Sequence, residues 1–180
     1  EPGLPIVETL TDHLRPKSCL IMLDNCEHLL TACAELADTL TRACPAVKVL
    51  ATSREGLGIA GETTYRVPSL SVPDLEERVT PERAIEYEAV RLFTDRARLR
   101  QPAFALTSSS TPAVAEICQR LDGIPLAIEL AAARVRSLPV EEIASRLGDR
   151  FRLLTGGSRT ALPRQQTLRA AIDWSYGLLG

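Results

Sequence analysis

Two charged residues, Asp24 and Arg54, stand just beyond two strand-like segments of the sequence and could together bind a phosphate group and its metal ion. Asp24 directly follows residues 19–23, and Arg54 lies close behind residues 47–51. A carboxylate can hold Mg²⁺, directly or through water, beside a nucleotide phosphate, and a guanidinium can bind a phosphate oxygen. The pair therefore predicts a Mg²⁺ ligand at Asp24 and a phosphate contact at Arg54.

Each of these residues also has an ordinary structural interpretation. An Asp that precedes a helix is a favourable N-cap, and a helical pattern that includes Leu29 follows Asp24 closely. Arg54 could instead form a salt bridge with Glu55, with Glu62 or with Asp24 itself. Both interpretations stay open beside the chemical ones.

The two strand-like segments are predicted to be neighbouring parallel strands. Residues 19–23 are apolar without alternation, which is typical of a strand buried on both faces, and residues 47–51 are interpreted as a second buried strand. Residues 27–43 between them carry one apolar stripe, which predicts an amphipathic helix. Parallel strands in such a βαβ unit end at the same edge of the sheet, where ligands bind in open α/β folds. Asp24 and Arg54 are therefore expected at one edge.

Further short elements are predicted along the chain. Residues 6–14 have helical spacing, residues 64–67 favour a third strand, and residues 69–80, with a proline and several charges, favour a linker. Beyond this linker the composition becomes helical. Helices are predicted at residues 81–99, 112–121 and 126–135, and from residues 139 and 163 onward.

Gly123 and Pro125 lie in the turn between two of the predicted helices. Gly123 closes one helix at a position where a left-handed residue is favoured, and Pro125 begins the next. That next helix is apolar on nearly every side, so it is predicted to be internal.

The composition is that of a folded protein with one ordinary domain or two small ones. The 180 residues are 45% hydrophobic and 24% charged with a formal net charge of −2, so neither general disorder nor an overall attraction to nucleic acid or anionic lipid is predicted. No apolar segment reaches the length of a membrane span. The five cysteines are an odd number, and we interpret them as reduced packing residues of a cytoplasmic protein.

Four stretches resemble, in order, the nucleotide-binding module of the STAND ATPases, the AP-ATPase or NB-ARC-like group, and above all its members in bacterial transcriptional regulators. LIMLDNCEH (20–28) resembles the Walker B strand of that family, and VLATSRE (49–55) resembles its sensor strand. GIPLA (123–127) is similar to the G-x-P-L-A motif of the helical subdomain. Residues 164–176 resemble the opening of the winged-helix subdomain, so the resemblance covers nearly the whole chain.

The resemblance implies an α/β fold in three parts. Residues 1–80 would be the C-terminal part of a nucleotide-binding domain with a parallel sheet of the P-loop NTPase type. Residues 81–157 would form the helical subdomain, and residues 158–180 would begin the winged helix.

The resemblance also implies ATP or ADP with Mg²⁺ as cofactors. Asp24 would help to position the metal ion, and Arg54 would sense the terminal phosphate. Pro125 would pack against the adenine, and Gly123 would give the backbone room to approach. In the intact protein, nucleotide exchange would shift the orientation of the parts.

The sequence departs from the family pattern in two places. It contains no phosphate-binding G-x-x-x-x-G-K-[ST] loop, which we expect upstream of Glu1, and the absence of an initiator Met suggests an excised piece. Asn25 stands where the family often has a second acid, so the catalytic base is unassigned. The isolated chain is therefore expected to be inactive.

The predicted function is a fragment of an ATP/ADP-dependent signalling switch, with slow ATPase turnover at most, in a cytoplasmic transcriptional regulator. The intact protein is expected to self-associate and to contact DNA only through regions outside this chain, with no membrane partner. One alternative is a nucleotide-free protein-interaction module. Another is a receiver-type phospho-switch with Asp24 as acceptor and Thr52 as its hydroxyl, although the usual acidic pair and lysine are missing.

Overall fold

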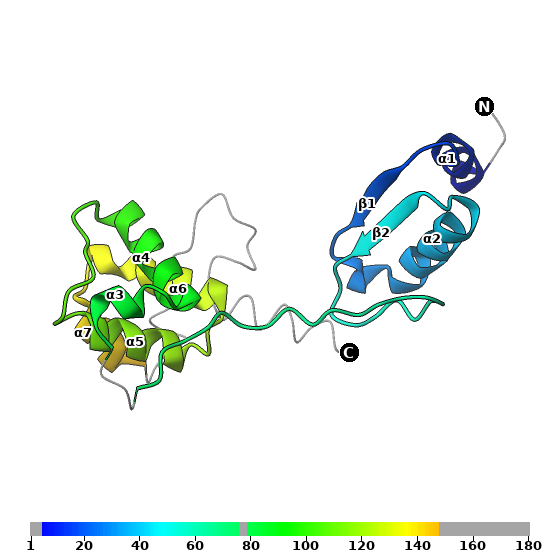
Figure 1. Ribbon diagram of the computed structural model, residues 1–180. Coiled ribbons are helices and arrows are strands. Elements are labelled where there is room, and N and C mark those ends of the chain that lie inside the picture. Colours follow the sequence, from blue (N-terminus) through cyan, green and yellow to red (C-terminus); the bar gives the residue numbers. More distant parts are fainter. Residues whose placement is uncertain (1–4, 76–78, 148–180) are drawn as a thin grey trace. The chain divides into compact units, whose positions relative to one another are not determined.

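The computed structural model describes residues 5–75 and 79–147. The chain divides into two compact units, Glu1–Arg66 and Val67–Gly180. Figure 1 shows a small sheet with its helices in the first unit and a group of packed helices in the second. The chain is thus a mixed α/β protein.

The first unit is built on two parallel strands. Strand β1 (Cys19–Leu23) pairs with β2 (Val47–Ala51), with Cys19 opposite Val47. The predicted strand–helix–strand order is confirmed, because α2 (Leu30–Ala43) connects the two strands after a short 3₁₀ turn, η1 (Cys26–His28). Helix α1 (Ile6–Leu14) precedes β1.

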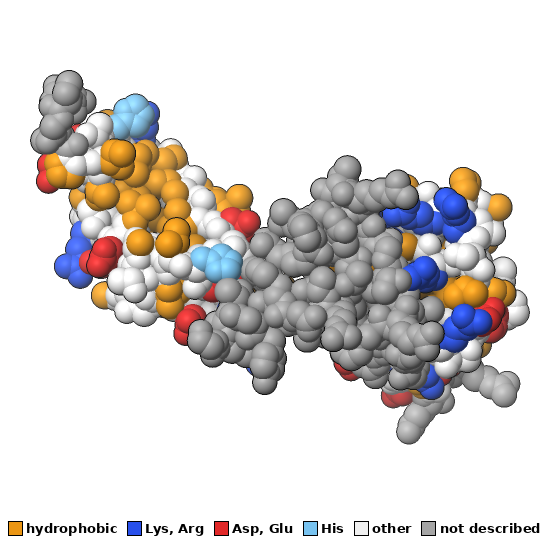
Figure 2. Space-filling view, turned by 180° about the vertical axis from the view of Figure 1, so that it is seen from behind, with side chains coloured by type: hydrophobic (Ala, Val, Ile, Leu, Met, Phe, Trp, Pro, Cys, Tyr) orange, Lys and Arg blue, Asp and Glu red, His pale blue; other side chains and the backbone are white. Residues whose placement is uncertain are grey.

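Only one face of this sheet is covered among the described residues. Leu14, Leu40, Cys44 and Val47 are buried together with Cys19 and Ile21 packed against them. The opposite face exposes Leu20 (64%), Met22 (66%) and Leu50 (50%), and Figure 2 shows hydrophobic side chains gathered on one face of this unit. The prediction of strands buried on both faces is therefore wrong for the described part, because the side chains alternate and the helices cover one side only.

The predicted third strand is also wrong. Residues 64–67 are described and form no strand, and Tyr65 and Val67 are 78% and 80% exposed. An alternation of apolar and polar residues resembles a strand pattern, but a strand forms only where a sheet edge offers backbone partners.

The second unit is helical. It contains the short helix α3 (Pro81–Ala84), then α4 (Glu88–Arg100), α5 (Thr111–Arg120), α6 (Pro125–Ala132), the 3₁₀ turn η2 (Ala133–Arg136) and α7 (Val140–Arg146). Helix α6 is buried along most of its length, so the prediction of an internal helix is confirmed.

One continuous core holds these helices together. Phe93 of α4 is fully buried, and its ring meets that of Phe104 edge to face with centroids 6.1 Å apart. The other fully buried large side chains come from four helices and the residue after the last of them: Val90, Thr94, Thr111, Val114, Ile117, Ile128, Leu130, Ile143 and Leu147.

The single helix predicted for residues 81–99 is interrupted. Residues 85–87 separate α3 from α4, and Tyr87 has an extended backbone at the start of α4. The first two amides of α4 are bonded by Ser71, which lies in the predicted linker: the Glu88 amide donates to the Ser71 hydroxyl (3.0 Å) and the Ala89 amide to the Ser71 carbonyl (3.1 Å). A new helix start with its own caps therefore replaces one long helix.

Several predicted elements lie outside the described residues. They are the helix from residue 163, the winged-helix start at residues 158–180 and the end of the helical part at residue 157. The predicted domain boundaries stay predictions. In the described ranges, no helix combines the length and the apolar character needed to cross a membrane.

Candidate functional site

The carboxyl ends of β1 and β2 are joined by Thr52. Its amide donates to the Leu23 carbonyl (2.8 Å), which continues the parallel ladder by one residue, and its carbonyl accepts from the Cys26 amide (2.9 Å). Its hydroxyl accepts from the Asn25 amide (2.9 Å) and donates to Oδ1 of Asp24. Thr52 thus fixes the backbone after β1 and orients the Asp24 carboxylate.

The turn after Asp24 explains why Asp24 is not a helix cap. Asn25 adopts a left-handed backbone (φ 65°) and makes no side-chain cap bond to η1. Helix α2 begins after Leu29, again without a side-chain cap. The carboxylate of Asp24 is held by the hydroxyl of the neighbouring strand end, so the N-cap interpretation does not describe its role.

Asp24 fits one part of a magnesium site. Its side chain is exposed at the sheet edge, and one carboxylate oxygen is oriented by Thr52. Mg²⁺ in nucleotide sites is commonly held by one or two carboxylates, with water and phosphate oxygens as the other ligands. Among residues 5–75 and 79–147, no three acidic, His or Cys side chains are grouped to hold a metal alone. Any ion at Asp24 would therefore take its other ligands from water or from a bound phosphate.

Arg54 lies in an exposed bend three residues after β2 ends. The loop behind it is shaped by Glu62, whose carboxylate accepts hydrogen bonds from the amides of Leu57 (2.8 Å) and Gly58 (2.7 Å). These two amides lower the pKa of Glu62 below its ordinary value. Asp24 and Arg54 thus both follow strand ends at the same end of the sheet.

Cys26, the buried residue behind this edge, is not suited to nucleophilic chemistry. Burial and a hydrogen bond with Cys33 raise the pKa of its thiol to about 11, so the thiol stays protonated near neutral pH. Its Sγ lies 3.4 Å from the Leu23 carbonyl oxygen. All five cysteines are free thiols, as the sequence predicted.

The turn with Gly123 and Pro125 belongs to the second unit. Gly123 is left-handed (φ 65°), and its amide donates to the Cys118 carbonyl (3.2 Å), as in a helix end closed by glycine. A Cβ atom at Gly123 would lie 2.1 Å from the carbonyl oxygen of Leu70. The room that this glycine leaves is therefore filled by the chain's own backbone, while Pro125 is exposed at the start of α6.

A shallow depression of about 440 Å³ lies beside Pro125. Leu70 and Leu92 supply the other apolar parts of its wall. Its remaining lining is charged: Glu88, Arg91, Asp95, Arg96 and Glu129. Arg96 and Glu129 form an ion pair across α4 and α6 (2.8 Å). Three acids and two arginines make this surface unsuited to a triphosphate, whereas its apolar wall suits a flat uncharged ring.

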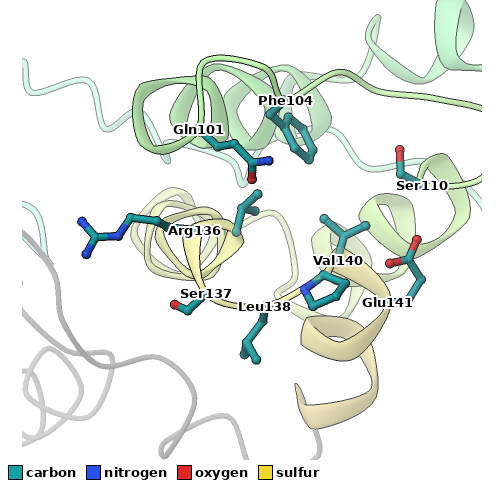
Figure 3. A pocket seen from close by; sticks show the side chains of 10 residues that line it. Gln101, Phe104, Ser110, Arg136, Ser137, Leu138, Val140 and Glu141 are labelled. Atoms are coloured by element: carbon teal, nitrogen blue, oxygen red, sulfur yellow. The ribbon is translucent and has the colours of Figure 1, made fainter.

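A second depression of about 450 Å³ lies between the end of α4 and the turn before α7. Figure 3 shows the Phe104 ring and Val140 directed towards it, with Arg136 extending away. No residue predicted for the nucleotide site lines it. Its lining mixes apolar residues with polar ones (Gln101, Ser110, Arg136, Ser137 and Glu141), and it contains none of the residue groupings that the sequence singled out for chemistry.

The structure places the four residues predicted for the nucleotide site in two pairs, and it shows two further residues that contact them. Asp24 and Arg54 share the first unit, and Gly123 and Pro125 share the second; the convergence of all four stays a prediction. The sequence offers Thr52 only as a phospho-switch hydroxyl, and its position at the end of the second parallel strand is the signal for its bond to Asp24. Leu70 gave no signal in the sequence, because it contacts Gly123 from a segment that resembles a linker.

Relatives of this chain have been named in mycobacteria. The chain is 54% identical over 179 residues to "Putative HTH-type transcriptional regulator Rv0890c" of Mycobacterium tuberculosis and to "Putative HTH-type transcriptional regulator Mb0914c" of Mycobacterium bovis. It is 45% identical over 179 residues to "Uncharacterized protein Rv0894" of Mycobacterium tuberculosis. Each match covers 99% of this chain.

These relatives are longer than the chain. The match covers 19% of each named regulator and 42% of the uncharacterized protein. No protein-family model and no solved structure matches the chain. The chain is therefore similar to one segment of proteins that are named as transcriptional regulators.

Proposed function

We propose that the chain is the segment of a STAND-type switch that carries its metal-positioning and adenine-contacting parts, within a transcriptional regulator. The observation that carries this proposal is Asp24 at the carboxyl end of a parallel strand, oriented by Thr52 from the neighbouring strand end. A carboxylate at this place in a parallel sheet suits a metal ion beside a phosphate. Bound Mg²⁺ would neutralise phosphate charge, and Asp24 would hold it.

The second unit supports a separate role for Pro125. Its exposed ring lines a depression together with Leu70 and Leu92, and this apolar wall suits an adenine ring better than a phosphate. In the proposal, Arg54 binds the terminal phosphate in the first unit and distinguishes ATP from ADP. The two states of the switch then differ in their contacts with the nucleotide, as a population shift requires.

The proposed place of the chain in a transcriptional regulator draws on the names of its relatives. The formal net charge of −2 offers no overall attraction to DNA, so DNA contacts are assigned to other regions of the regulator. We also assign the intact protein to the cytoplasm and expect it to self-associate. Turnover of ATP, where it occurs, is slow and resets the switch.

Thermal unfolding with nucleotide tests the proposal. The 180-residue chain and a longer polypeptide that includes the residues preceding it are heated with Mg-ATP, with Mg-ADP and without nucleotide. A ligand at one hundred times its Kd stabilises the native state by about 2.7 kcal/mol, so the midpoint of the longer polypeptide is expected to rise. Midpoints of thermal unfolding that stay unchanged with both nucleotides would contradict the proposal.

Matched variants separate the proposed roles. Asp24→Asn should weaken the Mg²⁺-dependent part of nucleotide affinity, whereas Asp38→Asn should not, because Asp38 only pairs with Arg42 on the surface of α2 (2.9 Å). Arg54→Ala should narrow the difference between ATP and ADP affinity. An equal loss of both affinities would contradict the sensing role.

Activity of the 180-residue chain gives a further check. A phosphate-release assay should detect negligible turnover, because the chain contains no phosphate-binding loop. Steady turnover that disappears in Asp24→Ala would show that the chain itself contains a complete ATPase site.

A nucleotide-free interaction module is the second candidate, and the open sheet face favours it. Leu20, Met22 and Leu50 expose an apolar surface of the kind that protein contacts cover. This candidate predicts no response to nucleotide in the same thermal experiment, so one measurement separates the two.

A further inference from the structure

Residues 70–73 are held on the helices of the second unit by hydrogen bonds of Leu70 and Ser71, by packing of Val72 and by burial of Pro73. The Leu70 amide donates to the Gly123 carbonyl (3.0 Å), and the Ser71 amide donates to Oε2 of Glu88 (3.1 Å). The Ser71 hydroxyl and carbonyl accept from the first two amides of α4. Leu70 and Val72 also pack against the helical core, and Pro73 is buried.

The residues that precede this segment, 63–69, lack such contacts. Residues 63–69 are exposed throughout, and their backbone makes no hydrogen bond to another described residue. The division between the two units falls within this stretch, between Arg66 and Val67. An exposed backbone without partners bends at little cost, whereas Leu70 and Ser71 would first have to break their hydrogen bonds.

We infer that residues 70–73 form a strap that anchors the chain on the second unit and confines bending between the units to residues 63–69, with Gly123 as its positioning residue. Ser71 of the strap caps α4, and the adjacent Leu70 lies against the Gly123 turn. This inference goes beyond the proposed function and holds whether or not nucleotide binds.

Gly123 is the positioning residue because the strap needs its missing side chain. A Cβ atom there would lie 2.1 Å from the Leu70 carbonyl oxygen, closer than real Cβ contacts come, and 3.1 Å from the Leu70 amide nitrogen, which is also tight. The neighbouring atoms belong to the backbone of the strap, so a substitution must move the strap itself. Leu70 of the strap also lines the depression beside Pro125. The end of residues 63–69 that adjoins the strap therefore lies next to that surface.

Hydrogen exchange of individual amides, followed by NMR on the 180-residue chain, tests the inference. In the unchanged chain, the amides of Leu70 and Ser71 should exchange at least about tenfold more slowly than those of residues 63–67. In Gly123→Ala this difference should disappear. Equal exchange in both segments of the unchanged chain, or full protection of Leu70 in a folded Gly123→Ala, would overturn the inference.

Gly61→Ala is the matched control. Gly61 has a similar backbone (φ 78°), but nothing lies within 4 Å of a Cβ atom added there. Both substitutions therefore carry the conformational penalty of a left-handed alanine, and only Gly123→Ala displaces the strap. Release of the strap in both variants would contradict the role of Gly123.

A second variant serves if Gly123→Ala loses its helical circular dichroism. Glu88→Ala removes the carboxylate that accepts from the Ser71 amide without adding an atom near the strap. It should free the Ser71 amide while Phe93 amide exchange stays slow. Chymotrypsin gives an independent measure, because it should cut after the exposed Tyr65 in every variant and after Leu70 only when the strap is released. Continued protection of the Ser71 amide in Glu88→Ala would count against the inference.

Discussion

The two units bury their apolar side chains in different ways. The helical unit encloses a core to which every one of its described helices contributes, and its largest core side chain, Phe93, is fully buried. The α/β unit has a small cluster around Leu40 on one sheet face, and it exposes Leu20 and Met22 on the other. Two parallel strands rarely suffice for an independent sheet. The helical unit is therefore expected to be stable by itself, while the α/β unit has a surface suited to further contacts.

The largest expected loss of stability follows a substitution in the helical core. Phe93→Ala should destabilise the second unit by about 3–5 kcal/mol, because it leaves a cavity where a buried ring packs on Phe104. Leu99→Ala on the same helix is the control, since Leu99 is 73% exposed and its loss should cost less than about 0.5 kcal/mol. Urea unfolding followed by circular dichroism measures both. Similar losses for the two variants would show that the described core is not the stabilising one.

A pair of substitutions in the first unit sharpens the contrast between its two sheet faces. Leu40→Ala should cost about 2–5 kcal/mol, because Leu40 is fully buried between helix and sheet. Met22→Ala on the open face should cost less than about 0.5 kcal/mol. Thermal unfolding of both variants measures these two stability losses. If Met22→Ala costs as much as Leu40→Ala, the open face is covered in solution.

Thiol chemistry should distinguish the buried cysteine of the helical unit. Burial raises the pKa of Cys118 to about 12, so iodoacetamide at pH 8 should leave it unmodified while the half-buried Cys33 reacts. The folded state keeps the thiol protonated, and the unfolded thiol ionises near pH 9. Stability should therefore fall as the pH rises above 9, and the fall should be smaller in Cys118→Ala. Rapid native labelling of Cys118, read by mass spectrometry, would show that the helical core opens easily.

The smallest effect concerns the loop behind Arg54. Two backbone amides lower the pKa of Glu62, so the bonded loop should be present above the ordinary carboxyl range and lost as the pH falls through the lowered pKa. The amide NMR shifts of Leu57 and Gly58 should follow this titration with a midpoint below 4.5, the ordinary value for Glu. In Glu62→Gln the titration should vanish. A midpoint at or above 4.5 would mean that the loop is not held by the carboxylate.

Local patterns predicted the parts of the fold that depend on local burial. The strand-like segments at 19–23 and 47–51 and the striped helix between them predicted a parallel pair, because a helix between two strands favours that connection. The apolar residues 126–135 likewise predicted an internal helix. The open sheet face was missed because an apolar run does not reveal how many elements exist to cover it.

The strap and the site depend on contacts between distant residues. Ser71 caps a helix that begins 17 residues later, and Leu70 meets Gly123 across a still longer separation, so no periodicity marks either contact. Thr52 and Asp24 were both visible as strand-end residues, but the bond between them depends on the register of the two strands. The sequence pattern therefore located the Asp24 and Thr52 side chains, and the register of the two strands determined how they are oriented.

The capping of α4 by Ser71 also determines where this protein can be divided. Cutting before Pro81, where the first helix of the second unit begins, would remove the acceptors of the Glu88 and Ala89 amides and the Leu70 backbone that lies against Gly123. A truncated protein that starts at Val67 retains them. The smallest fragment that folds into the native second unit should therefore begin before the first helix, among residues that form no secondary structure.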